Sequence, residues 1–271
     1  MRHLFSEWHE ISETLNGKPI SIFLDYDGTL APIKRDPHKA VISKETKKIL
    51  SKLSKQPNCK LAIISGRALR DVKRFVGLKD IAYAGNHGLE VENIGSEFKE
   101  PIPSGTRAVF EKIRDYLTRK LSAIKGMMIE DKGLGVSVHY RQVSPSGVRS
   151  LKNIFKEATK SFVENGQIKV NPGKKVLEVR PQTGWNKGEI ALWLLAQQQA
   201  DLNGEISMPI YIGDDATDED AFKMLRNKGV TVFVGKSKRS NALYYLRNIK
   251  EVKDFLKRLL KLCPQKADAH D

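Results

Sequence analysis

The chain has 271 residues, 40% of them hydrophobic and 29% charged, and carries a formal net charge of +15 at pH 7. This length and composition predict one or two domains with a proper hydrophobic core. The two cysteines, Cys59 and Cys263, exclude a disulfide framework and a paired metal-ligand spacing. No apolar run approaches the length of a membrane span, and acidic residues interrupt the N-terminal segment where a signal peptide needs an apolar stretch. We therefore expect a cytoplasmic protein with no membrane partner.

The positive charge is spread over predicted helical faces. Lysines are mixed with a glutamate in the segments 44–48 and 250–253, which is typical of a solvated helix surface. A nucleic-acid-binding protein would instead concentrate Lys and Arg and place aromatic residues between them to stack on bases. A basic surface also raises the local concentration of small anions. We expect a monomer that binds a small anionic molecule and no nucleic acid.

The first informative element in chain order is a predicted strand over 20–25, which leads into the run Asp25-Tyr26-Asp27-Gly28-Thr29. One of its two aspartates can attack phosphorus, and the other can handle the proton of the leaving oxygen. Two carboxylates this close repel each other strongly unless a cation lies between them, so the spacing implies a bound divalent metal. Asp and Gly are also common turn residues, and an acidic turn without chemistry is the alternative.

A second apolar strand, predicted over 59–65, ends in Ser65-Gly66-Arg67. The Ser65 hydroxyl could hydrogen-bond a phosphate oxygen. Arg67 could face the same anionic site, or it could pair with Asp71 one helical turn later. The turn Asn86-His87-Gly88 follows a third strand, and its histidine is either a structural residue or a substrate contact.

Two later segments bring further charged residues to strand and helix ends. Lys187 lies at the start of a predicted helix, where its ammonium would add to the preference of a helix N-terminus for anions. Asp214 and Asp215 follow another apolar strand and are candidate Mg²⁺ ligands, because Mg²⁺ prefers hard oxygen donors. Asp218 could orient Lys187 through a hydrogen bond. A solvated lysine and an acidic helix cap are the alternatives.

The core of the chain alternates strands with helices. Strands are predicted at 20–25, 59–65, 80–84, 209–213 and 230–234, and helices at 43–55, 68–76, 186–198, 217–226 and 240–248. The strands are short and apolar, as in parallel sheets that are covered on both faces. The pattern predicts a doubly wound α/β fold with a parallel sheet, in which ligands bind beyond the carboxyl ends of the strands. Asp25, Ser65 and Asp214 all fall at such ends.

The pattern changes over 101–181, which we expect to form an inserted α/β domain with an antiparallel sheet and two helices. Its predicted order is helix 106–124, strands 127–130 and 135–141, helix 147–164, and strands 167–171 and 175–180. The core domain is then divided into 1–100 and 182–262. The segment 263–271 has little apolar content and is expected to be a flexible tail.

Strand alternation gives the inserted sheet one apolar and one polar face. Val136, Val138 and Tyr140 point one way and would pack on the helices. The opposite face gathers long charged residues of both signs: Glu130, Lys132, His139, Arg141, Glu178 and Arg180. Donors and acceptors of this kind suit the hydroxyls of a sugar, although the outer face of a half-exposed sheet is polar in any case.

In these motifs the chain resembles the haloacid dehalogenase superfamily of aspartate-nucleophile phosphatases, and more closely its trehalose-6-phosphate phosphatase family. The resemblance runs from about residue 20 to about residue 235 and rests on the runs Leu24–Leu30, Ser65–Arg67, Gly85–Glu90 and Gly213–Phe222. It implies a Mg²⁺-dependent phosphatase with a haloacid-dehalogenase-like core and an inserted cap. The implied reaction removes phosphate from trehalose 6-phosphate to give trehalose, through an aspartyl-phosphate intermediate.

The resemblance also implies roles for single residues. The catalytic set would be Asp25 as nucleophile and Asp27 as acid and base, together with Ser65 and Lys187. The metal would be held by Asp25, Asp27, Asp214 and Asp215, with Asp218 behind them. Substrate contacts are expected from Gly66, Arg67, Asn86, His87, Glu130, Lys132, Arg141, Lys174 and Glu178.

Two alternatives remain open at this point. A related phosphatase for another sugar phosphate, such as sucrose phosphate or a mannosyl- or glucosyl-glycerate phosphate, would share the core motifs and differ in the inserted domain. A non-enzymatic module that binds a phosphorylated ligand or nucleic acid would be favoured by the loss of Asp25 or Asp27, and both are present.

Overall fold

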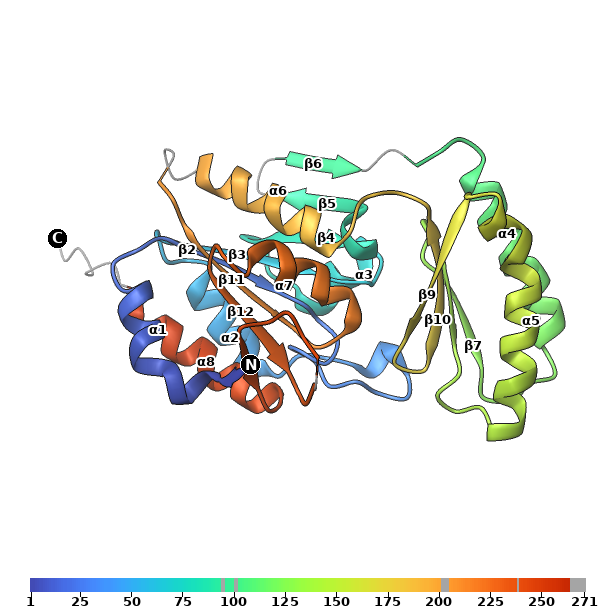
Figure 1. Cartoon of the computed structure of the whole chain (residues 1–271), viewed down its shortest axis with the longest axis horizontal. Helices are drawn as coiled ribbons and strands as arrows, with labels where there is room; N and C mark the ends of the chain where they lie inside the picture. The colour runs from blue at the N-terminus through green and yellow to red at the C-terminus, as the bar shows by residue number, and fades with distance from the viewer. Residues whose placement is uncertain (94–95, 100–101, 201–204, 238, 264–271) are drawn as a thin grey trace. The chain divides into compact units, whose positions relative to one another are not determined.

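The computed structural model describes residues 1–93, 96–99, 102–200, 205–237 and 239–263. The chain divides into two compact units (Figure 1). The first, called the core unit below, comprises Met1–Lys99 and Trp185–Asp271, and the second, the inserted unit, comprises Glu100–Gly184. The tail expected over 263–271 lies outside the described residues except for Cys263, whose side chain is buried.

Among the described residues, a nine-stranded sheet forms the centre of the core unit. In spatial order its strands are β1 (Arg2–His3), β13 (Tyr244–Leu246), β12 (Val230–Val234), β11 (Met208–Gly213), β2 (Ile20–Leu24), β3 (Cys59–Ile64), β4 (Ala82–Gly85), β5 (Glu90–Asn93) and β6 (Ser96–Lys99). Neighbouring strands from β1 to β4 are parallel, and β5 and β6 extend the sheet in antiparallel fashion. Because β2 lies between β11 and β3, the carboxyl ends of these three strands meet at one edge of the sheet.

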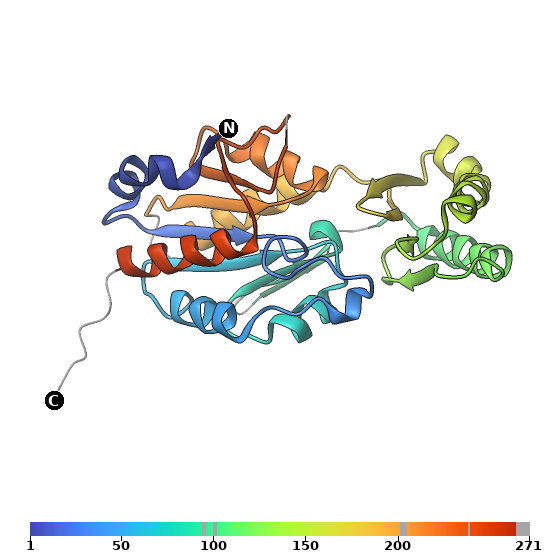
Figure 2. The ribbon, with the colours of Figure 1, turned by 90° about the horizontal axis from the view of Figure 1, so that it is seen from below.

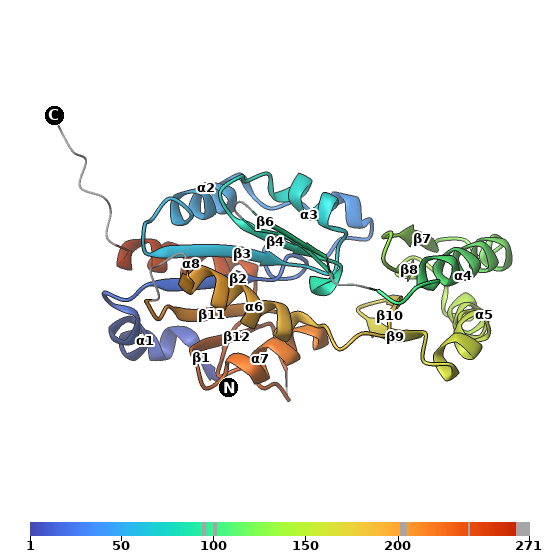
Figure 3. The same cartoon turned by 90° about the horizontal axis from the view of Figure 1, so that it is seen from above.

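Helices cover both faces of this sheet. One face packs against α1 (Trp8–Leu15), α2 (Lys44–Leu53), α3 (Leu69–Val76) and α8 (Ile249–Leu262), and the other against α6 (Lys187–Ala200) and α7 (Glu219–Leu225). Figure 3 shows α6 in front of β2 and β11. Along β2, Ile22 and Leu24 join the first group and Phe23 the second. Burial on both faces explains why the core strands are apolar without alternation.

Short sequence signals set several helix ends. The Ser43 hydroxyl accepts a hydrogen bond from the backbone N–H of Thr46 at 3.0 Å and begins α2. The Asn248 side-chain oxygen accepts from the N–H of Glu251 at 3.1 Å and begins α8. At its other end, α3 stops at Gly77, whose φ of 60° is in the left-handed region that glycine tolerates best.

In the described part of the inserted unit, four antiparallel strands pair in the order β7 (Met128–Asp131), β8 (Val136–His139), β10 (Val176–Pro181) and β9 (Ile168–Gly173). The helices α4 (Thr106–Leu121) and α5 (Pro145–Glu164) lie on one side of these strands (Figure 2). Val136, Val138 and Val179 face the helices and form a separate hydrophobic core with them. The polar residues of the same strands therefore face away from the helices, as strand alternation predicts.

The α/β fold class predicted from the sequence is confirmed, but one core element is wrong. The helix predicted over 240–248 is absent from the described residues there, and β13 (Tyr244–Leu246) occupies its centre. Tyr244 and Leu246 are buried with Tyr245 between them half-exposed, which is a strand alternation. Parallel pairing of β13 with β12 on one side and β1 on the other stabilises this conformation over a helical one.

Among the helices that the structure describes, none is long and apolar enough to cross a membrane.

The capping residue of α8 offers a test of the fold. Replacing Asn248 by Ala should lower the free energy of unfolding by about 1 kcal/mol, because the N–H of Glu251 loses its acceptor. Asn248→Ser retains an acceptor and should lower the free energy of unfolding by only a few tenths of a kcal/mol. Urea-induced unfolding followed by circular dichroism measures both, and equal losses in the two variants would contradict the capping role.

Candidate active site

Among the described residues of the core unit, the most enclosed positively charged group is the Lys187 ammonium. Its Nζ donates hydrogen bonds to Asp25 Oδ1 at 2.7 Å and to Asp218 Oδ1 at 2.8 Å. The side chains of Lys187, Asp25 and Asp218 are 2%, 7% and 0% exposed. Charges removed from water to this extent are strongly destabilising unless they are paired. Burial alone would lower the pKa of Lys187, but the Asp218 and Asp25 carboxylates outweigh it and raise the pKa above its ordinary value. The lysine is therefore an ammonium at neutral pH.

Three neighbouring strands supply the polar side chains at this edge of the sheet. Asp25 directly follows β2, and its backbone N–H donates to the carbonyl of Ile212 on β11 at 2.9 Å. Asp214 follows β11, and Ser65 follows β3, the other neighbour of β2. Asp25, Ser65 and Asp214 are all buried. The parallel arrangement predicted from the sequence thus places the ends of these strands together.

Asp218 fixes the geometry behind this edge. Its Oδ1 accepts from Lys187 and from the Tyr211 hydroxyl at 2.9 Å, and its Oδ2 accepts from the backbone N–H groups of Asp214 at 3.0 Å and Asp215 at 2.9 Å. Burial raises the pKa of Tyr211 well above its ordinary value, so its hydroxyl keeps the proton that it donates. One carboxylate thereby orients both the lysine and the turn that carries Asp214.

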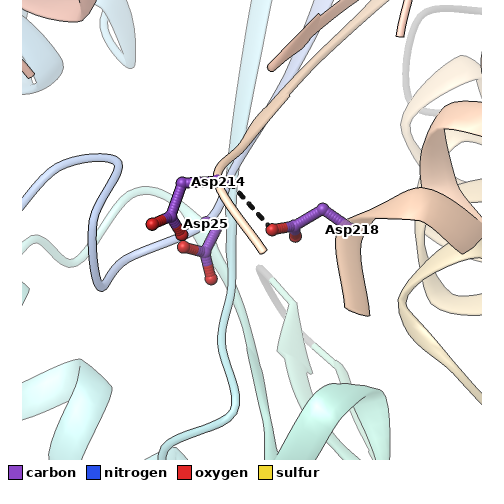
Figure 4. A group of neighbouring side chains, drawn as sticks. All are labelled: Asp25, Asp214 and Asp218. Carbon is purple, nitrogen blue, oxygen red and sulfur yellow. Dashed lines mark hydrogen bonds between the residues drawn. The ribbon is translucent and has the colours of Figure 1, made fainter. Parts of the chain in front are cut away.

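Among the described residues, one group of acidic side chains is close enough to hold a metal ion. Oxygen atoms of Asp25, Asp214 and Asp218 lie within 4.8 Å of one another. Figure 4 shows the Asp25 and Asp214 carboxylates next to each other, with Asp218 reaching toward them from the other side. Because both Asp218 oxygens accept hydrogen bonds from the protein, a cation here would take its ligands from Asp25 and Asp214.

The charges of this group favour a divalent cation. Three buried carboxylates share one buried ammonium, so that two negative charges have no counterpart within the cluster when all three acids are ionised. Burial raises the pKa of Asp25 well above its ordinary value, because desolvation outweighs the attraction of Lys187 and because Asp218 and Asp214 repel its charge. A hard divalent cation would compensate both charges and keep Asp25 ionised.

Gly28 makes room for the Asp214 carboxylate. The glycine has φ +87°, and a Cβ atom at this position would lie 1.9 Å from Asp214 Oδ2. Any larger residue would therefore push the carboxylate out of the cluster. The sequence marks Gly28 as a turn residue, but it carries no sign of the contact with Asp214, which lies 186 positions later in the chain.

Two of the predicted metal ligands have their carboxylates outside this group. Asp27 accepts hydrogen bonds from Arg67 Nε at 2.6 Å and Nη2 at 2.7 Å. Asp215 Oδ1 accepts from the N–H of Ala216 at 2.6 Å and caps the short 3₁₀ helix Ala216–Asp218. The partner considered for Arg67 at the sequence level, Asp71, pairs with Arg74 at 3.2 Å.

The turn after β4 packs on the loop after β3. The backbone N–H of Asn86 donates to the carbonyl of Arg67 at 2.7 Å, and that of His87 donates to the carbonyl of Ser65 at 2.9 Å. Both Asn86 (φ 49°) and His87 (φ 59°) adopt the left-handed conformation, which is unfavourable for residues other than glycine. The His87 ring covers Gly66, where a Cβ would lie 2.6 Å from the ring. These backbone bonds fix Ser65 and its neighbours next to Asp25's strand.

In the inserted unit, the strand register places polar residues in one row across the sheet. Glu130 pairs with Ser137, Ser137 pairs with Glu178, and Glu178 pairs with Asn171. Lys132 Nζ donates to Glu178 Oε1 at 2.5 Å, and both side chains are 10% exposed. The Oδ1 atom of Asn171 is buried and has no hydrogen-bond partner. Alternation along single strands found Glu130 and Glu178, but Ser137 and Asn171 join the set only through pairing between strands.

The other polar residues predicted on this face are also held by neighbours. His139 Nε2 lies 2.8 Å from Glu130 Oε2, and Arg141 Nη2 donates to the carbonyl of Lys174. Lys174 and Lys175 form the two-residue turn between β9 and β10, with φ 68° at Lys175. The face is therefore an ordered network of donors and acceptors.

Comparison with known proteins decides the family. A family model described as trehalose-phosphatase matches residues 23–250. The chain belongs to the trehalose-phosphatase family. The match covers the strand ends that carry Asp25, Ser65 and Asp214, together with the whole inserted unit.

Relatives and solved structures of the trehalose-phosphatase family agree with this assignment. Trehalose-phosphate phosphatase B of Arabidopsis thaliana is 37% identical over 264 residues, which are 93% of this chain and 69% of the relative. Probable trehalose-phosphate phosphatase 3 of Oryza sativa subsp. japonica is 35% identical over 274 residues, with 94% and 73% covered. The C. albicans trehalose-6-phosphate phosphatase C-terminal domain is similar with a TM-score of 0.80 and 28% identity, over 93% of this chain and 96% of that one. The resemblance, fold and phosphatase class predicted from the sequence are confirmed.

The contact between Gly28 and Asp214 provides a test of the cation site in this family member. If Asp25 and Asp214 hold a divalent cation, Gly28→Ala should displace the Asp214 carboxylate and weaken the binding of that cation by about tenfold or more, the range typical for changes around metal ligands. Titration calorimetry with Mg²⁺ measures the affinity without reference to activity.

Gly17→Ala is the matched control for this variant. Gly17 has a similar φ of +72°, but a Cβ there would meet no atom within 4 Å. Both variants should lose stability through backbone strain, and only Gly28→Ala should lose Mg²⁺ affinity. Equal Mg²⁺ affinity in the two variants would exclude Asp214 as a ligand.

Proposed function

We propose that this trehalose-phosphatase hydrolyses trehalose 6-phosphate in a Mg²⁺-dependent reaction that proceeds through an aspartyl-phosphate on Asp25. The observation that carries the proposal is the buried Asp25–Lys187–Asp218 cluster at the carboxyl end of β2. Such a cluster offers a nucleophile, a fixed positive charge and an excess of carboxylates for a hard cation at one point. The family assignment supports the phosphorylated disaccharide as the substrate.

The chemistry assigned to the core unit has two steps. A carboxylate oxygen of Asp25 attacks phosphorus, and the bond from phosphorus to the sugar oxygen breaks while Asp27 gives that oxygen its proton. Asp27 then takes a proton from a water molecule, which attacks the aspartyl-phosphate and releases inorganic phosphate and free Asp25. In the structure the Asp27 side chain is 39% exposed, so it is accessible to a substrate oxygen and to water.

Lys187 and Ser65 are assigned to the phosphoryl oxygens. The negative charge of these oxygens must be balanced throughout phosphoryl transfer, and most of the catalysis comes from positioned charges and hydrogen-bond donors. Lys187 is held by Asp218 in a fixed orientation and remains charged, while Ser65 supplies a hydroxyl from the adjacent strand. Neither group has to move or change its protonation state during the reaction.

Asp25 and Asp214 would hold Mg²⁺, which prefers carboxylate oxygens and retained water as ligands. When bound, the ion neutralises negative charge on the transferring phosphoryl group. Asp27 and Asp215 are kept as candidate ligands on the basis of the sequence resemblance.

For the inserted unit we propose a role as a cap that recognises the sugar. Glu130 and Glu178 flank Ser137 in the polar row, and Lys132 lies on Glu178, so that acceptors and donors alternate within a few ångströms. Disaccharide hydroxyls need both kinds of partner. Additional contacts are assigned to Arg141 and Lys174 here, and to Gly66, Asn86 and His87 in the core unit. Arg67, which the sequence resemblance places among the substrate contacts, instead holds the Asp27 carboxylate.

We also propose that the protein acts in the cytoplasm as a monomer and does not bind nucleic acid. Ion pairs on α8 support the absence of nucleic-acid binding, because Lys253 and Lys257 both pair with Glu45 at 2.5 Å. Lysines neutralised in this way present less charge to a polyanion than the net charge of the chain indicates.

The assignment of the nucleophile is tested by Asp25→Asn, which keeps the size of the side chain and removes its attacking charge. Release of phosphate from trehalose 6-phosphate should fall about a thousandfold or more while circular dichroism shows an unchanged fold. Asp80→Asn, at an exposed aspartate of the same unit, is the control and should keep full activity. Near-normal turnover by a folded Asp25→Asn protein would refute the proposed mechanism.

The assignment of the cap is tested with Glu130→Ala and Glu178→Ala. Each should lower kcat/KM for trehalose 6-phosphate about tenfold or more, equivalent to about 1.4 kcal/mol, because a sugar hydroxyl loses its acceptor. Activity on p-nitrophenyl phosphate, which has no hydroxyls, should change far less. Glu164→Ala, at an exposed glutamate of α5, serves as the control. Parallel losses on both substrates would mean that these residues support folding and do not recognise the sugar.

A panel of phosphorylated sugars assayed for phosphate release distinguishes the remaining substrate candidates. Trehalose 6-phosphate should give the highest kcat/KM. A higher value for sucrose phosphate or a glycosyl-glycerate phosphate would replace the substrate while leaving the mechanism in the core unit intact.

A further inference from the structure

The Asp27 carboxylate is held by Arg67. Both of its oxygens accept hydrogen bonds from the Arg67 guanidinium, Oδ2 from Nε at 2.6 Å and Oδ1 from Nη2 at 2.7 Å. Two parallel bonds of this kind fix the plane of a carboxylate as well as its position. The Arg67 side chain is 9% exposed and that of Asp27 is 39% exposed. The arginine therefore lies behind the carboxylate, on the side away from solvent.

Aromatic rings hold the guanidinium in place. The central carbon of the group lies 5.2 Å from the centroid of the Tyr26 ring and 4.8 Å from that of the Phe75 ring. Tyr26 is itself fully buried and fixed, because its hydroxyl donates to the carbonyl of Ala40 at 2.8 Å. Contacts of a cation with aromatic rings strengthen when the cation is removed from water. The guanidinium is thus buried against two aromatic rings, and the ion pair differs from a surface salt bridge.

The main chain and a neighbouring turn also immobilise Arg67. Its N–H donates to Ser65 Oγ at 3.2 Å, and its carbonyl accepts from the N–H of Asn86 at 2.7 Å. The Nη2 group that holds Asp27 also donates to the carbonyl of Pro37 at 2.8 Å, in the 3₁₀ turn Pro37–Lys39. These bonds fix both the backbone and the guanidinium of Arg67, and the Asp27 carboxylate that it holds is more exposed than the arginine itself.

We propose that Arg67 is a positioning residue for proton transfer by Asp27, and that its fork is directed at this carboxylate and not at the phosphoryl group. The proposal rests on the role of Asp27 as acid and base given above. In the first step the proton passes from the Asp27 carboxyl to the leaving oxygen as the bond from that oxygen to phosphorus breaks. The direction of that proton depends on the plane in which Arg67 holds the carboxylate.

The inference predicts that, in the first step, Arg67 matters only as much as the leaving oxygen needs a proton. The second step, in which Asp27 takes a proton from water, is common to all substrates, so the first step is followed alone as release of the leaving group in a single turnover. A nitrophenolate leaves as a stable anion, whereas an alkoxide such as that of benzyl alcohol or a sugar must be protonated as it leaves. General acid catalysis contributes typically 10²–10⁴-fold. Benzyl phosphate and p-nitrophenyl phosphate are similar in size and lack sugar hydroxyls, so that comparing them isolates the proton from recognition of the sugar.

Arg67→Lys keeps the charge but cannot form the two parallel bonds or stack as a plane on the rings. It should lower the single-turnover rate of leaving-group release from benzyl phosphate and trehalose 6-phosphate at least about thirtyfold, with KM within about threefold of the wild-type value. For p-nitrophenyl phosphate, the single-turnover release of nitrophenolate should slow by less than about threefold. Arg74→Lys is the matched control, since Arg74 also lies over the Phe75 ring, at 5.1 Å, but pairs with Asp71. It should leave all three substrates unchanged.

Phe75→Leu is a second variant that leaves the ion pair in place and removes one ring from the guanidinium. It should show the same selective loss on a smaller scale, and it keeps the proposal testable if Arg67→Lys fails to fold. Asp27→Asn should show a selective loss at least as large as that of Arg67→Lys. Adding Arg67→Lys to Asp27→Asn should cost little more, because the two residues act as one unit.

The outcomes distinguish a failure of the role proposed for Arg67 from a failure of the role proposed for Asp27. A rise in KM with equal losses on all substrates would overturn the proposal and make Arg67 a phosphate-binding residue. Additive losses in the double variant would overturn it as well. If Asp27→Asn slows the single-turnover release of benzyl alcohol and of nitrophenolate equally, Asp27 is not the general acid, and the proposed function of Asp27 fails before that of Arg67.

Discussion

The core unit depends on one buried ammonium held between two carboxylates. Asp25 precedes the inserted unit in the chain and Lys187 follows it, so their hydrogen bond joins residues 162 positions apart. Loss of Lys187 would leave the buried Asp25 and Asp218 carboxylates without their counterpart, which is among the most destabilising changes a protein interior can suffer. Both parts of the core unit must therefore be in place before these charges are compensated. The same contact that completes the fold also presents the nucleophile.

A conflict between folding and catalysis follows from the composition of this cluster. Stability of the apo protein favours a protonated Asp25, because burial and two further carboxylates raise its pKa. Nucleophilic attack requires the ionised form. A divalent cation bound by Asp25 and Asp214 would resolve the conflict, since it stabilises the form of Asp25 that the reaction uses. The excess of buried carboxylates thus destabilises the apo protein, and the same carboxylates would strengthen the binding of a divalent cation. The Asp218 carboxylate does not need a cation for its stabilisation, because both of its oxygens accept hydrogen bonds from the protein.

Much of this arrangement could be predicted from the sequence, because local patterns in a parallel sheet carry global information. A short apolar strand must be buried on both faces, and its carboxyl end must then lie at the common edge with those of its neighbours. Asp25, Ser65 and Asp214 could be placed for this reason alone. The same logic failed at 240–248, where spaced apolar residues fit a helix as well as a strand, and pairing with β1 and β12 decided for the strand. Cys263 was assigned to a tail but is buried, and a hydrogen bond to it raises the pKa of the Cys59 thiol.

Contacts between distant segments were beyond prediction. Alternation places Glu130 and Glu178 on one face, but only the register between strands puts Ser137 directly between them and Asn171 at the end of the row. Likewise, helical spacing offers Asp71 as a partner for Arg67, whereas the fold brings Asp27 within reach and encloses the pair with Tyr26 and Phe75. An ion pair between residues four positions apart on a helix, such as Arg67 and Asp71, contributes only a few tenths of a kcal/mol at an exposed site. Once a guanidinium is buried, a bidentate carboxylate and two rings stabilise it far more than one solvated neighbour could, and the choice of partner is made by tertiary structure.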